Sequence, residues 1–72
     1  MKVDTVNVIE WECDTIQHVH SFTDNEAGCK SAELLFTTLI IGKGCPEEDV
    51  ESYIEDGRYE KKGYEVFLTH SS

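Results

Sequence analysis

The chain has few of the features that mark secreted, membrane-spanning or disulfide-stapled proteins. Its three cysteines, Cys13, Cys29 and Cys45, are an odd number and form no C-x-x-C pair, so a disulfide framework is not expected. No charged-then-apolar leader follows Met1, and no apolar run approaches the roughly 20 residues of a membrane-spanning helix. We therefore expect a reduced, soluble and cytoplasmic protein.

Basic residues are also scarce. Six lysines and arginines face fifteen acids, which gives a formal net charge of −9 at pH 7. Proteins that bind nucleic acid directly need lysine and arginine to displace phosphate counterions, and anionic membrane surfaces favour the same residues. Both kinds of partner are therefore disfavoured. The charge suits high solubility or attraction to a basic protein surface.

The length leaves little room for catalysis. A chain of 72 residues without linker, repeat or low-complexity segment is one domain, residues 1–72, and a domain of this size buries only about 60% of its unfolded surface. An enclosed substrate pocket is hard to fit behind so small a core. There is no G-x-S-x-G and no phosphate-binding loop, and Cys29 lies past the first turn of its expected helix. We therefore expect a protein that is not an enzyme and uses no cofactor.

Three segments have the β-branched and alternating composition of strands: residues 3–12, 15–22 and 64–70. Cys13 and Asp14 separate the first two and predict a hairpin turn. In the third segment, Val66 and Leu68 share one face with His70, while Phe67 interrupts the opposite, polar face.

A helix is expected between the second and third strands. Thr23 with Glu26 three residues later has the pattern of a capping box, and Gly42 is placed to end the helix. Leu34 and Ile41 fall outside the apolar stripe. We expect the stripe to cover the sheet; it consists of Ala32, Leu35, Phe36 and Leu39.

The segment 46–57 predicts a second, acidic helix. Pro46 suits its first turn, Gly57 its end, and Val50, Tyr53 and Ile54 share one side. Between its ends lie six carboxylates and no basic residue: Glu47, Glu48, Asp49, Glu51, Glu55 and Asp56. They form either the solvated side of an amphipathic helix or a docking surface for a basic partner.

The predicted element order is β-β-α-α-β. It indicates the α+β class, with a small three-stranded antiparallel or mixed sheet and two helices on one face. No family resemblance follows from these patterns.

A metal-binding domain is the alternative to a protein-binding one. His18 and His20 are two residues apart on a strand, so their imidazoles point the same way, and Ile16 has the same parity. If the last strand pairs with the second, His70 and Cys13 approach this pair, and imidazole and thiolate are zinc ligands. The spacing matches no compact zinc motif, so the leading expectation is no metal. A third alternative is a structural homo-oligomer, formed through an open sheet edge or through Leu34 and Ile41.

The leading hypothesis is a small protein-binding module whose second helix contacts a basic protein surface. In its sharper form, the six acids imitate the phosphates of a nucleic acid and occupy its site on a binding protein. Small acidic inhibitors carried by phages and mobile elements are similar in charge and size only. The expected partner is a basic protein, with no direct nucleic acid and no membrane, and a homodimer is compatible with this hypothesis.

Overall fold

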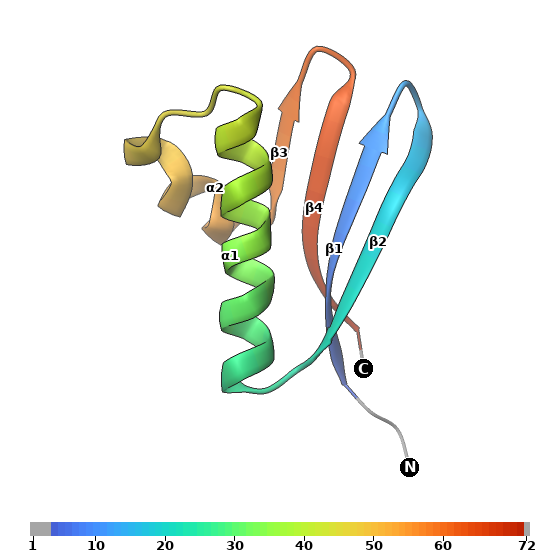
Figure 1. The fold of residues 1–72 in the computed structure, drawn as a ribbon, viewed down its shortest axis with the longest axis vertical. Helices are drawn as coiled ribbons and strands as arrows, with labels where there is room; N and C mark the ends of the chain where they lie inside the picture. The colour runs from blue at the N-terminus through green and yellow to red at the C-terminus, as the bar shows by residue number, and fades with distance from the viewer. Residues whose placement is uncertain (1–3, 72) are drawn as a thin grey trace.

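The computed structural model describes residues 4–71 as a four-stranded antiparallel sheet with both helices on one face. The sheet order is β2-β1-β4-β3 (Figure 1). Neither helix in this part of the chain has the length and apolar character that a membrane crossing needs. The elements in chain order are β1 (Thr5–Glu12), β2 (Thr15–Thr23), α1 (Glu26–Gly42), the 3-10 turn η1 (Glu47–Asp49), α2 (Val50–Asp56), β3 (Arg58–Lys61) and β4 (Tyr64–Ser71).

The predicted hairpin between β1 and β2 is confirmed, but its register contains a shift. Cys13 and Asp14 both have positive φ, 52° and 63°, the pattern of a type I′ turn, whose twist suits paired strands. Glu10 lies opposite His18, whereas the next residue of β1, Trp11, lies opposite Ile16. The extra residue in β2 is a β-bulge, and it moves Ile16 to the face opposite to His18. The expectation that Ile16 shares the histidine face is therefore wrong.

The α+β class is confirmed, whereas the three-stranded sheet is wrong. Residues 58–61, for which no strand was predicted, form β3 and pair with β4 through a turn at Lys62 and Gly63. A strand of four residues is too short to show a convincing alternation. The sheet is wholly antiparallel, and β4 pairs with β1 instead of β2.

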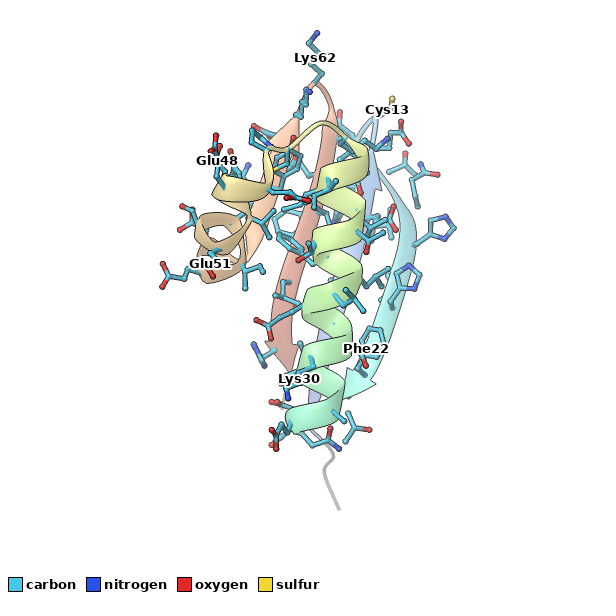
Figure 2. The ribbon with its side chains drawn as sticks, turned by 60° about the vertical axis from the view of Figure 1, so that its left-hand side comes forward. Cys13, Phe22, Lys30, Glu48, Glu51 and Lys62 are labelled. Carbon is cyan, nitrogen blue, oxygen red and sulfur yellow. The ribbon has the colours of Figure 1, made fainter. Side chains whose placement is uncertain are left out.

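The core lies between the inner face of the sheet and α1. Val8 and Val66 are fully buried beneath Phe36 and Ile40, and Figure 2 shows α1 crossing this face. The predicted stripe is partly right: Ala32 and Phe36 are buried, Leu35 and Leu39 are half-buried against the core, and the buried Ile40 was missed. Leu34 and Ile41 are exposed, as their place outside the stripe suggested.

The predicted start of α1 moves by two residues. Asn25, instead of Thr23, caps α1, and its side chain accepts from the Gly28 amide at 2.7 Å, because β2 continues through Thr23. At the other end α1 stops at Gly42 as predicted, but the glycine with positive φ, 100°, is Gly44. Gly57 ends α2 in the left-handed conformation as expected, with φ of 71°.

Neighbouring isoleucines of α1 test where its buried face lies. Ile40 is 0% exposed and Ile41 39%, so the same loss of one methylene leaves a cavity only at residue 40. We expect Ile40→Val to lower the free energy of unfolding by about 0.5–1.5 kcal/mol. Ile41→Val should change it by less than about 0.5 kcal/mol. Urea unfolding measures both, and equal losses would contradict this packing.

Candidate functional site

The six acids predicted as a contact surface lie together on η1 and α2, and we call them the acidic surface. All six are exposed, because α2 turns Val50, Tyr53 and Ile54 toward the core. Figure 2 shows Glu48 and Glu51 on the side of these elements that faces away from α1. The members are Glu47, Glu48, Asp49, Glu51, Glu55 and Asp56.

No positive charge within residues 4–71 forms an ion pair with this surface. Three of the basic side chains in the described residues make other contacts. Lys30 lies 3.5 Å from Glu26, Arg58 contacts Glu60 and Glu65, and Lys61 donates to a backbone carbonyl at 2.9 Å. The field of the acidic surface is therefore uncompensated by the described ion pairs and directed into solvent.

The four residues of the metal-binding alternative are not brought together. The rings of His18 and His20 do share a face, with centroids 5.9 Å apart. His70, however, lies opposite Val6 on β4, with β1 between it and β2, and Cys13 lies in the turn at the other end of the sheet. The alternative assumed that the last strand pairs with β2. In the described chain, no group of three His, Cys, Asp or Glu side chains is placed to hold a metal ion.

A cluster that the sequence did not predict joins Asp24, Cys29 and His70. The Cys29 thiol donates to Asp24 Oδ1 at 3.2 Å, and His70 Nδ1 lies 3.4 Å from Asp24 Oδ2. Asp24 and Cys29 flank the start of α1, so their proximity is visible in the sequence. His70 is 46 residues away from Asp24, and only the pairing of β4 with β1 brings it there.

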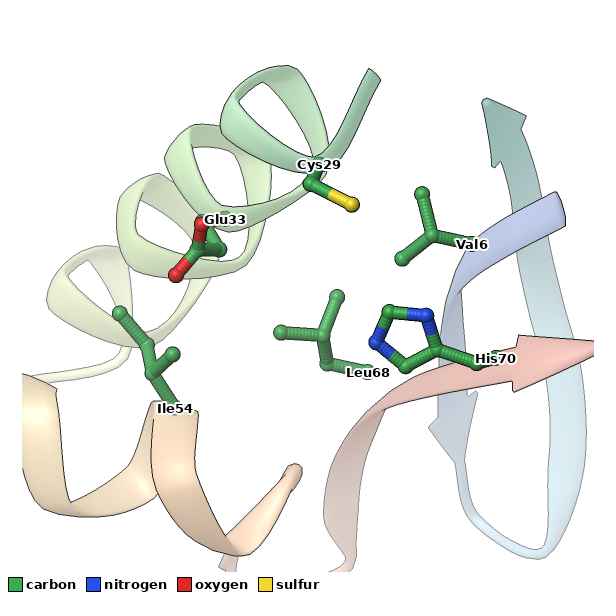
Figure 3. Close-up of a pocket in the computed structure, with 6 residues that line it drawn as sticks. All are labelled: Val6, Cys29, Glu33, Ile54, Leu68 and His70. Carbon is green, nitrogen blue, oxygen red and sulfur yellow. The ribbon is translucent and has the colours of Figure 1, made fainter. Parts of the chain in front are cut away.

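The pKa of the thiol in this cluster is shifted in the direction opposite to that of an activated nucleophile. The hydrogen bond to Asp24 raises the pKa of the Cys29 thiol, and the bonds from Cys29 and His70 lower the pKa of Asp24. A reactive cysteine needs a depressed pKa and a base that accepts its proton. Figure 3 shows Cys29 and His70 beside an open hollow of about 270 Å³. The remaining lining residues are Val6, Glu33, Ile54 and Leu68.

A second polar group lies on the inner face of the sheet around Glu10. His20 Nε2 lies 3.5 Å from one oxygen of Glu10, and the Tyr64 hydroxyl donates to the other at 3.4 Å. Lys43 Nζ sits 4.4 Å from the centroid of the Tyr64 ring. Burial, followed by the charge of Glu10, raises the pKa of Tyr64 to about 12. These contacts join β1, β2, β4 and the end of α1 where the core meets solvent.

The reactivity of Cys29 tests the first cluster. In a Cys13→Ser background, which removes the exposed thiol, we expect Asp24→Asn to increase the alkylation rate of Cys29 severalfold at mildly alkaline pH. Removing the carboxylate returns the thiol pKa toward its ordinary value and raises the thiolate fraction. Mass spectrometry locates the label. The matched control is Asp14→Asn, and equal acceleration in both variants would contradict the assigned contact.

Alkaline titration tests Tyr64. The unfolded chain releases this proton near pH 10, whereas the folded protein keeps it to about pH 12. The stability that this proton contributes is therefore full below pH 10 and is lost as pH rises to 12. Tyr64→Phe should show a shallower decline of the urea midpoint. Some decline remains, because burial also raises the pKa of Tyr59. Parallel curves for the two proteins would contradict the assignment.

Comparison of the chain with protein-family models, with curated proteins and with solved structures found no match. A function for this chain has to be argued from its own residues. The described surface offers three features for that purpose: the unpaired acidic surface, the cluster at Asp24, and the sheet face that the helices leave open.

Proposed function

We propose that the protein is a non-enzymatic binding module whose acidic surface docks on a basic surface of another protein. The observation that carries the proposal is the exposure of six carboxylates on one side of the molecule, without an ion pair in residues 4–71. Such a surface attracts a positively charged protein at long range and accelerates its association.

Folding alone does not favour this arrangement. Glu51 and Glu55 are one helical turn apart in α2, and like charges at that spacing cost a few tenths of a kcal/mol. Glu55 and Asp56 also lie in the last turn of α2, which contains no basic residue. Negative charge at the carboxyl end of a helix opposes the macrodipole. The helix dipole therefore accounts for the acids at the start of this segment and not for those at its end.

The surroundings of Asp56 suit a long basic side chain. An open hollow beside α2 is lined by Tyr53, Asp56, Arg58 and Glu60. A lysine or arginine of the partner can place its stem against the Tyr53 ring and its charge near the Asp56 carboxylate. Arg58 is held by Glu60 and Glu65 at 3.3 and 3.1 Å, so part of its charge is already offset.

The partner class follows from the chemistry of carboxylates. Regularly exposed negative charges imitate a phosphate backbone, so the site that fits them best is one that otherwise binds nucleic acid. The protein then acts as an inhibitor or regulator that competes with nucleic acid for that site. A merely solvated acidic helix is the alternative that the experiment below has to exclude.

The test neutralises the acidic surface without altering its shape. The triple variant Glu48→Gln, Glu51→Gln and Glu55→Gln should lose about tenfold or more in affinity for the basic protein recovered by affinity capture and then purified. Thermal stability should be equal or slightly higher, because the repulsion within α2 is relieved. Calorimetric titration at several salt concentrations measures the affinity, and binding of the wild type should weaken as salt rises.

A matched control changes net charge by the same amount elsewhere on the surface. The variant Asp4→Asn, Glu12→Gln and Asp14→Asn removes three exposed carboxylates outside η1 and α2. It should bind the partner nearly as tightly as the wild type. If the two triple variants lose the same affinity, only net charge matters. If neither loses affinity, the acidic surface is only solvated.

A further inference from the structure

The sheet face opposite the helices carries an apolar cluster, and we call this face the outer face. Both helices lie on the inner face, so no described element covers the outer one. Ile16 and Val19 are 48% and 55% exposed, and the other members are half-buried. The cluster consists of Ile9, Trp11, Ile16, Val19 and Phe67.

Strand register places these side chains in two adjacent rows. Val19, Ile9 and Phe67 are aligned across β2, β1 and β4, and Ile16 lies beside Trp11 in the next row. The bulge in β2 brings Ile16 to this face. The cluster therefore spans three strands as one continuous surface, and contiguous exposed apolar surface is typical of interaction sites.

The outer face is nearly free of charge, although the chain carries −9. The charged side chains that strand register places on it are Arg58, Glu60 and Glu65 at the β3 margin, where Arg58 contacts both carboxylates. The guanidinium also lies 5.9 Å from the Phe67 ring centroid. The other polar residues of this face are uncharged: Thr5, Asn7, Ser21, Thr23 and Thr69.

We propose that the outer face binds the outer face of a second copy of this chain, so that two sheets pack face to face. A two-fold interface uses the same surface on both partners, and an apolar, nearly neutral surface matches itself without needing complementary charge. The acidic surface offers no such match, because two copies of it repel. In the dimer the two sheets lie about 10 Å apart, and both helix layers, with their acidic surfaces, lie outside.

The size of the face predicts a weak dimer. Four strands about 4.8 Å apart, four to nine residues long at about 3.3 Å per residue, cover on the order of 400–500 Å² per copy. The total is close to the lower limit of about 1,000 Å² for a specific interface. We therefore expect dissociation at low micromolar concentration and dimers at higher concentration.

The effect of salt on binding distinguishes this interface from the acidic surface. Two chains of charge −9 repel at long range, and salt screens that repulsion. The dimer should therefore become stronger as salt rises, whereas docking on a basic partner becomes weaker. The inference does not rest on the proposed function, because it uses the apolar cluster of the outer face and none of the six acids.

Analytical ultracentrifugation of the full chain, from micromolar to millimolar concentration, tests the dimer. Trp11 is the chain's one tryptophan, so its emission should shift to shorter wavelength as dimers form. Val19→Lys places a charge within the apolar cluster, on the edge strand β2, and should weaken association at least tenfold. The matched control is Leu34→Lys, a similar change at a 68% exposed position of α1, and it should dimerise like the wild type.

The wild type overturns the proposal if it remains a monomer at millimolar concentration in high salt. Equal weakening by Val19→Lys and Leu34→Lys also overturns it, because the cluster would then have no special role. If Val19→Lys does not fold, Val19→Thr replaces it, since threonine is β-branched, suits strands and is of similar size. The triple glutamine variant of the acidic surface must still dimerise, so loss of partner binding and loss of dimerisation are separate results.

Discussion

The pairing of β1 with both β2 and β4 is the constraint on which the rest of the fold depends. It makes β1 a central strand, so Val6 and Val8 lie under α1 and, together with Val66, complete a core with Phe36 and Ile40. A chain of 72 residues then has enough helix to cover one face of its four-stranded sheet and not the other. Small domains bury a modest share of their surface, and here the unburied share includes an entire sheet face.

This single layer of helices separates the surface into two sides of different chemistry. The helix side carries the acidic surface on η1 and α2, while the outer face is apolar in its centre and nearly neutral. Charged groups are excluded from the core because desolvation is costly. The acids of α2 therefore lie on the side of the helix that faces away from the core. The partners that we propose for the two sides are of opposite kind, and salt should act on their binding in opposite directions.

The inner face shows how the chain accommodates polar groups near a small core. Asp24 accepts a hydrogen bond from the Cys29 thiol and contacts His70. Glu10 accepts a hydrogen bond from the Tyr64 hydroxyl. The contacts of Asp24 with His70 and of Glu10 with Tyr64 link segments far apart in the chain. No buried side-chain N or O atom among the described residues lacks a partner. The hydrogen bond to Asp24 raises the pKa of Cys29, whereas burial, followed by the charge of Glu10, raises the pKa of Tyr64. These contacts are typical of structural hydrogen bonds. A catalytic nucleophile needs a lowered pKa, whereas the pKa of both groups is raised.

The sequence by itself determined the elements whose signals are local. Alternation identified β1, β2 and β4, the apolar stripe identified α1, and Gly57 marked the end of α2, because period, capping and left-handed glycine depend on near neighbours. The exposure of the six acids was also foreseeable, since Val50, Tyr53 and Ile54 define the buried side. Only the tertiary structure decided that β4 pairs with β1, which separates His70 from His18 and joins it to Asp24. Register likewise placed Ile16 beside Trp11, because a shift of one residue moves a side chain to the other face, and no local pattern encodes which strand lies next to which.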